Sequence, residues 1–232
     1  LVQALNGKLV REGTFLDNQE EGVWSSYYDN GKLDSKGTYL RGEYDSTWTY
    51  RYENGQISSI VEYLADERHG ITRIYSPDGK PIIEKLYYSG SLLSYRMISN
   101  ESASDWVPFN GNATISAKYP GGKTAYEETY KNGALDGVKR TYYDNGNLCS
   151  EYRYVLGGYH GEYKTYYSNG NVNEKGTYNL GERHGVREIY NEDGSLSSRE
   201  NFVMGSRQGK AELFVKGAKS IEFKFNGGMT YE

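Results

Sequence analysis

The stretch YYDNGKL at residues 27–33 decides the fold, because it recurs as YYDNGNL at 142–148 and as YYSNGNV at 166–172. The glycine of this motif belongs to two series whose successive members lie 24 residues apart. The series are Gly7, Gly31, Gly55 and Gly79, and then Gly122, Gly146, Gly170 and Gly194. The residue before the glycine is usually Asn or Asp, which tolerate the positive backbone angles of a two-residue type I′ turn. Each glycine therefore predicts one β-hairpin.

Apolar residues follow the same period as the turns. Eight positions after each glycine the residue is aromatic: Phe15, Tyr39, Tyr63, Tyr87, Tyr130, Tyr154, Tyr178 and Phe202. Two positions after it the residue is usually aliphatic: Leu9, Leu33, Ile57, Leu148, Val172 and Leu196. Because the two positions differ by an even number, we expect them on the same buried face of an extended strand. No stretch has a helical spacing of apolar residues that competes with this pattern.

The composition favours a thin sheet over a thick core. Of the 232 residues only 36% are hydrophobic, while 25 are Tyr and 29 are Gly. Tyrosine rings bury large apolar areas and keep their hydroxyls hydrated, and the units of a repeat array pack only on their neighbours. We therefore predict an all-β fold: an elongated, single-layer, twisted meander of antiparallel hairpins with a 24-residue period.

The period is interrupted once. Gly79 and Gly122 are 43 residues apart, and the sequence between them resembles a decayed repeat with strands at 92–98 and 105–109. The predicted organisation is a first block of hairpin repeats at 1–88, a degenerate repeat or insertion at 89–114, and a second block with a C-terminal cap at 115–232. The interruption is either a structural irregularity or, through Trp106, part of a partner site, since loops on rigid scaffolds often carry recognition.

Charge and hydropathy exclude several classes of function. The longest run without a charged residue, 106–117, is 12 residues long, well short of the ~20 apolar residues of a membrane helix, so we expect a soluble chain. A net charge of −4 without a basic cluster argues against nucleic acid and anionic membranes as partners. The single Cys149 excludes an internal disulfide. Because the first residue is Leu1, we expect that a signal segment, a tag or another stretch was removed upstream.

No residue set predicts catalysis, a cofactor or a metal site. The three histidines, His69, His160 and His184, occupy one linker position, and such positions in adjacent repeats are about 9.6 Å apart, whereas zinc ligands converge within about 2.1 Å. We expect these side chains to satisfy backbone groups of the turn. Cys149 has no histidine placed as its base, and no glycine stretch has the spacing of a phosphate loop. We predict that the protein is not an enzyme.

The segments between hairpins carry a second signature, seen in GGYHG at 157–161, GERHG at 181–185 and DERHG at 66–70. A glycine, two residues, His and glycine resembles the linker of MORN repeats, and the YYxNGxL hairpin resembles the variant in bacterial proteins of the YwqK-family antitoxin type. The resemblance covers about 1–88 and 115–217 and departs at 43–46, EYDS, which lacks the histidine and closing glycine. It implies the repeat architecture, while such repeats serve many functions.

Aromatic residues of the strand before each turn are the candidate partner-binding residues. Tyr and Trp are favoured at binding hot spots, and large exposed apolar patches usually mark partner sites. If their face is open they form a recognition strip, and if the sheet folds on itself they are core. The candidates are Trp24, Tyr28, Trp48, Tyr50, Tyr52, Tyr119, Tyr143, Tyr163 and Tyr167, with Trp106 of the interruption.

Two functions remain open. The first is a non-enzymatic protein-binding module; the resemblance implies an immunity protein that binds and blocks a toxin domain, and an acidic strip would suit a basic, nucleic-acid-directed toxin. The alternative is a structural array of the envelope or cell surface that associates with itself or contacts glycans or lipid headgroups. The first implies the cytoplasm, and the second implies the periplasm or cell surface after removal of a signal segment.

Overall fold

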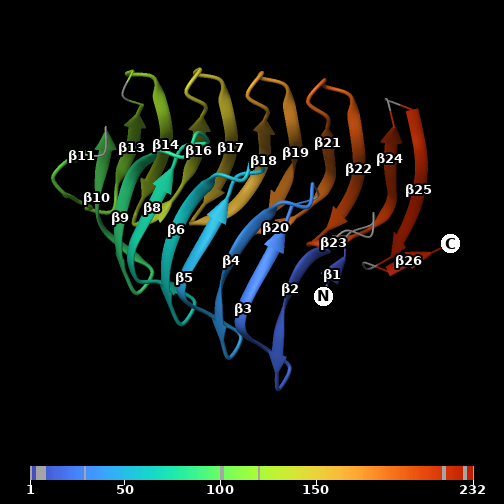
Figure 1. Ribbon diagram of the computed structural model, residues 1–232, viewed down its shortest axis with the longest axis horizontal. Helices are drawn as coiled ribbons and strands as arrows, with labels where there is room; N and C mark the ends of the chain where they lie inside the picture. The colour runs from blue at the N-terminus through green and yellow to red at the C-terminus, as the bar shows by residue number, and fades with distance from the viewer. Residues whose placement is uncertain are drawn as a thin grey trace. The chain divides into compact units, whose positions relative to one another are not determined.

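The computed structural model describes residues 2–3, 9–28, 30–99, 102–119, 121–215, 218–226 and 229–231. Within these ranges every regular element is a strand and no helix occurs, so the predicted all-β hairpin array is confirmed. The strands form two antiparallel sheets, and in each of them successive hairpins lie beside one another (Figure 1). The chain divides into unit 1, Leu1–Asn110 with Ala117–Ala125, and unit 2, Gly111–Ser116 with Tyr126–Glu232.

The first sheet has twelve strands. In spatial order they are β1 (Val2–Gln3), β2 (Leu9–Leu16), β3 (Gln19–Tyr27), β4 (Leu33–Leu40), β5 (Glu43–Arg51), β6 (Ile57–Leu64), β8 (Gly70–Tyr75), β9 (Pro81–Tyr88), β10 (Ser91–Ser99) and β11 (Ser102–Ala103). Two short strands lie off this path: β7 (Glu67–Arg68) pairs with β6, and β12 (Val107–Pro108) pairs with β10.

The second sheet has fourteen strands. In spatial order they are β13 (Ala113–Lys118), β14 (Thr124–Lys131), β16 (Gly137–Tyr142), β17 (Leu148–Val155), β18 (Gly158–Tyr166), β19 (Val172–Asn179), β21 (Gly185–Tyr190), β22 (Leu196–Val203), β24 (Gly209–Val215), β25 (Ala218–Asn226) and β26 (Met229–Tyr231). The short strands β15 (Ala134–Leu135), β20 (Glu182–Arg183) and β23 (Ser206–Arg207) pair with β14, β19 and β22.

The turns at the Asn-Gly motif differ in type from the prediction. The N–H of Gly55 donates to the carbonyl of Tyr52 and the N–H of Tyr52 to that of Gln56, both at 2.8 Å, which closes a three-residue loop. Of Asn54 and Gly55 only the glycine has a positive φ, of 95°. This is a type I turn followed by a left-handed residue, and the extra residue forms a bulge. The predicted turn at Gly7 lies outside the described residues.

Two-residue turns occur instead at the opposite ends of the strands, in the linkers. Arg41 and Gly42 both have positive φ, of 53° and 82°, as do Leu180 and Gly181, at 51° and 86°. Two successive positive φ values define the type I′ turn. The linker signature found in the sequence therefore encodes the tighter of the two hairpin connections.

A second bulge, inside the strand that follows the turn, changes which face each strand position occupies. Ser26 pairs with Ser35, but the next residue, Tyr27, pairs with Leu33 instead of residue 34. The same shift recurs in the equivalent hairpins, as at Tyr142 and Leu148. The expectation that positions two and eight after the glycine share a face is therefore wrong, because the extra residue reverses the alternation between them.

The tyrosine and asparagine of the motif hold each turn to the next one. The hydroxyls of Tyr52, Tyr143 and Tyr167 donate at 2.8 Å to the carbonyls of Tyr75, Tyr166 and Tyr190, and Tyr28 donates likewise to Arg51. The amides of the turn asparagines also donate to carbonyls of the following turn: Asn54 to Pro77 and Asn145 to Ser168. At the linker edge the donor is a glycine N–H, as in Gly157 to Leu135 at 2.8 Å. Both edges of the sheet are therefore bonded from repeat to repeat.

The core of unit 1 is one face of the sheet, here named the aromatic face, defined by Trp24, Tyr39 and Trp48. Trp48 lies across Gly37 of the neighbouring strand, and its indole N–H donates to the carbonyl of Thr38 at 2.9 Å. Its ring meets that of Tyr39 edge-on, with centroids 5.0 Å apart. Glycine is needed at residue 37 because any Cβ there would overlap the indole.

Aromatic residues at position eight are buried in most repeats, as predicted. Those below one tenth exposure are Tyr39, Tyr87, Tyr130, Tyr154 and Phe202. Phe15, in the first described hairpin of the array, is 60% exposed.

On the corresponding face of unit 2, a cluster of tyrosines lies beside buried charges. Tyr163 stacks on Tyr152 and donates its hydroxyl to Glu174, which receives Arg187 at 2.8 Å. Arg187 also bonds Glu200 at 3.2 Å. Burial raises the pKa of Glu174, but the charge and hydrogen bonds of Arg187 outweigh it and hold the pKa below its usual value.

Candidate functional site

Three of the predicted partner-binding aromatics are core residues. Trp24 and Trp48 are 2% exposed and Tyr163 is 3% exposed. Their rings lie over Gly13, Gly37 and Gly176, and so they share the face of the buried aromatic residues. Of the two alternatives that the sequence left open for these residues, the structure shows the core one for Trp24, Trp48 and Tyr163. A glycine in the neighbouring strand makes room for each large ring.

The other predicted tyrosines are mainly structural. Tyr119 is buried, and Tyr50 packs on Trp48 with its hydroxyl 3.3 Å from that of Tyr63. Tyr28, Tyr52, Tyr143 and Tyr167 are half-buried, and all four use their hydroxyls in the bonds between turns. Their contact with a partner stays a prediction for the ring surface that remains exposed.

Trp106 is placed differently. The half-buried ring lies 4.6 Å from the guanidinium carbon of Arg96. Arg96 in turn bonds Glu84 at 2.6 Å, together with Arg73, and the side chain of Glu84 is 1% exposed. Burial raises the pKa of Glu84, but these two arginines outweigh it and lower the pKa below its usual value. The interruption thus places an aromatic ring over an ion-pair network on the face opposite to the aromatic face.

This opposite face carries a line of charges in unit 2. Glu188 lies between Lys175, at 2.8 Å, and Arg199, at 2.7 Å, and it also accepts the hydroxyl of Tyr190. Arg140 and Glu151 form a similar pair at 2.7 Å. Cross-strand pairs of opposite charge stabilise a sheet, so this stretch of the face is largely satisfied by its own residues.

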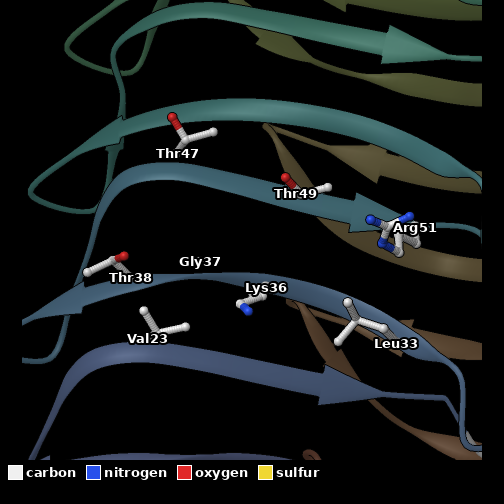
Figure 2. A pocket seen from close by; sticks show the side chains of 8 residues that line it. All are labelled: Val23, Leu33, Lys36, Gly37, Thr38, Thr47, Thr49 and Arg51. Carbon is white, nitrogen blue, oxygen red and sulfur yellow. The ribbon is translucent and has the colours of Figure 1, made fainter.

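In unit 1 the same face is hollowed. An open depression lies over β3, β4 and β5 (Figure 2). Its lining residues are Val23, Leu33, Lys36, Gly37, Thr38, Thr47, Thr49 and Arg51. One reason for the hollow is Thr49, a short side chain at a position where equivalent strands carry the longer, charged Arg73, Arg140, Lys164 and Glu188.

Lys36 lies in the middle of this hollow. It pairs across the strands with Ser25 and Thr49, neither of which has a charge. Among the described residues no carboxylate lies within ion-pair distance of its ammonium, and Glu12, two strands away, accepts the hydroxyl of Tyr27 at 2.5 Å. That hydrogen bond raises the pKa of Tyr27. The hollow therefore presents the cations Lys36 and Arg51, several hydroxyls and the aliphatic side chain of Val23, which is 57% exposed.

The described ranges contain no group of His, Cys, Asp and Glu that could hold a metal ion. The linker histidines form hydrogen bonds through the backbone: the N–H of His69 donates to the carbonyl of Glu62 and that of His184 to the carbonyl of Thr177, both at 2.9 Å. The imidazole ring of His69 lies against the ring of Tyr88. Nowhere in the described strands and turns is there a helix long and apolar enough to cross a membrane.

The structure is thus an array of β-hairpin repeats, and unit 1 carries an open hollow on the face opposite to the aromatic face. The chain belongs to the family of the MORN repeat variant. Its model matches six repeats, at residues 20–40, 44–65, 68–88, 135–155, 159–180 and 183–204. Repeats of this family are generally non-catalytic modules that bind proteins or membranes. No match to a curated protein was found.

Sequence reasoning missed Lys36 and the threonines around it. The sequence does contain a signal that could have identified them. The residues six before and five after each turn glycine face each other across two strands, and they often carry opposite charges, as Arg140 and Glu151 do. Read at those positions, Ser25, Lys36 and Thr49 are a cation flanked by two hydroxyl residues. The aromatic pattern drew attention to the other face.

Proposed function

We propose that the protein is a non-enzymatic binding module that holds a partner protein on the face of unit 1 opposite to the aromatic face. The observation that supports this best is the hollow over β3, β4 and β5, which is open and lined by exposed or half-buried side chains such as Val23 and Lys36. Trp106, on the same face beyond β9, is a predicted aromatic that is half-buried and lies outside the core. Binding energy concentrates on such aromatic and cationic residues.

An immunity protein that blocks a toxin domain is the concrete form of this proposal. The resemblance of the hairpin motif to YwqK-family antitoxins motivates it, and the rigidity of a sheet bonded along both edges suits an inhibitor that binds without reorganising. Co-expression with a cognate toxin should protect cells. A chain that neither protects cells from the toxin nor binds it would exclude this form while leaving other protein partners open.

The binding face is tested with two matched variants. Thr47→Trp fills the hollow, and Glu162→Trp places the same ring at the equivalent exposed position of unit 2, eight residues before the turn glycine. We expect immobilised native protein and Glu162→Trp to retain one stoichiometric partner protein from the native lysate, and Thr47→Trp to lose it while melting like Glu162→Trp. Equal retention by all three proteins would contradict the proposed face, and recovery of the protein itself alone would favour the alternative of a self-associating surface array.

A further inference from the structure

The hollow of unit 1 interrupts a pattern in which cations of this face are matched by carboxylates. Arg73 and Arg96 share Glu84, and in unit 2 Arg140 pairs with Glu151. Lys36 has hydroxyl side chains on both sides instead of acids. A lysine that no carboxylate of its own sheet neutralises is a ready partner for a carboxylate from outside.

The shape of the hollow indicates an extended ligand. Along β4 it runs from Leu33 to Thr38, six residues whose five steps span about 16 Å, and Val23 on β3 and Arg51 on β5 also line it. That length matches a peptide of about five residues in an extended conformation. Figure 2 shows Lys36 between Leu33 and Thr38, so a side chain near the middle of such a peptide would meet it.

The lining also indicates the chemical class of that ligand. Arg51 also lines the hollow and keeps its charge, but its guanidinium donates to the carbonyl of Gly55 at 2.9 Å. Among the described residues, Lys36 is the lining cation for which no acceptor is found. A single ammonium matches a single carboxylate, whereas phosphate sites usually gather several cations or backbone N–H groups. Val23 and Leu33 add apolar surface at the two ends, and Thr38 and Thr49 add hydroxyls between them.

We propose that this hollow binds an extended acidic segment of a partner protein, with one Asp or Glu carboxylate paired to Lys36 and neighbouring apolar side chains against Val23 and Leu33. The proposal rests on the proposed function and deepens it by naming the chemistry of the bound segment. A local acidic contact is compatible with a net charge of −4, because the cation lies in a hollow flanked by uncharged residues.

The experiment uses the full chain and NMR spectroscopy. The probes are the capped peptide Val-Ser-Asp-Ser-Leu, its twin with Asn in place of Asp, and acetate and inorganic phosphate. We expect the acidic peptide to shift the signals of Lys36, Thr38 and Thr49 saturably, and to bind about tenfold more tightly than the Asn twin, as for one charged hydrogen bond. Lys36→Met should remove this preference, while Lys164→Met, a half-buried lysine on the corresponding face of unit 2 at the position equivalent to Thr49, should preserve it.

Other outcomes overturn the proposal. Equal binding of the two peptides, shifts elsewhere on the chain, or no shifts at millimolar peptide would each do so. Stronger binding of phosphate than of the acidic peptide would identify a small-anion site instead. A partner that Lys36→Met retains as well as the native protein does would leave the proposed function standing and remove the acidic segment alone.

Discussion

Gly37→Ala is expected to lower the free energy of unfolding by about 2–4 kcal/mol. The alanine Cβ would lie 2.0 Å from Cδ2 of Trp48, which no contact tolerates, so the indole must move. Moving it disturbs the edge-on contact with Tyr39 and the indole hydrogen bond to Thr38. Overpacking costs about 1–3 kcal/mol, and a lost hydrogen bond adds about 1 kcal/mol. Residue 37 does not have a positive φ, so the backbone itself accepts alanine.

A double-mutant cycle separates this clash from other effects of the substitution. Trp48→Ala alone should cost about 3–5 kcal/mol, since it empties a buried site. In that background Gly37→Ala should be close to neutral, because the atoms with which its Cβ collides are gone. Urea unfolding followed by circular dichroism gives the stabilities. Hydrogen exchange of the β4 and β5 amides locates the loss, which is needed because repeat arrays depart from two-state unfolding.

Gly121→Ala is the matched control. A Cβ at Gly121 meets no atom within 4 Å, and its φ lies outside the left-handed region. This variant should remain within about 0.5 kcal/mol of the native protein. The reasoning fails if Gly37→Ala is as stable as Gly121→Ala, or if it costs the same with and without the indole of Trp48.

Three further predictions concern the hydrogen bonds, the charges and the turns. Tyr143→Phe should cost about 1 kcal/mol in thermal unfolding, because it removes the hydroxyl bond to the carbonyl of Tyr166; an unchanged melting temperature would refute the role of that bond. Burial raises the pKa of Glu188, but the hydrogen bonds that its carboxylate accepts outweigh burial and lower the pKa from 4.5 to about 2. Ionised Glu188 therefore stabilises the folded state above pH 4.5, and this contribution is lost as the pH falls toward 2. Glu188→Gln should therefore flatten the stability profile in that window by about 1–2 kcal/mol, after allowance for solvent screening, and parallel profiles would argue against the pairing. Leu180→Asn should leave stability equal or raise it by about 0.5 kcal/mol, since Leu180 is 77% exposed and has a φ of 51° that Asn tolerates better; a clear loss on calorimetry would show that the leucine packs.

The repeat period and the strand content were predictable because both depend on residues that are close together in the sequence. The glycine series predicts where each hairpin turns, and the aromatic residue eight positions later predicts a buried face, as Tyr39 and Tyr87 confirm. The turn type and the facing of the residues near the turn were not predictable from alternation alone. A type I turn replaces the expected type I′ turn, and a separate bulge at Asp34, inside β4, moves Leu33 to the face opposite to Tyr39.

The candidate site was harder to predict because its residues are unremarkable one by one. Trp24 and Trp48 attract attention as aromatic residues, yet each is accommodated by a glycine that lies eleven positions away in the sequence and on the neighbouring strand in space. Lys36 and Thr49 are common surface residues, and their meaning depends on which residues face them across the strands. That information requires the register, which the bulges set.

The hydrogen bonds between turns reach 23 residues ahead, from Tyr143 to Tyr166 and again from Tyr167 to Tyr190, nearly one full period. In each of these hydrogen bonds the donor is a tyrosine hydroxyl, and the acceptor is a backbone carbonyl, which any residue can provide. Excision or duplication of a whole 24-residue cassette therefore restores an equivalent joint. Gene duplication can thus lengthen or shorten the array in whole units, while the residues of the opposite face diversify from one cassette to the next.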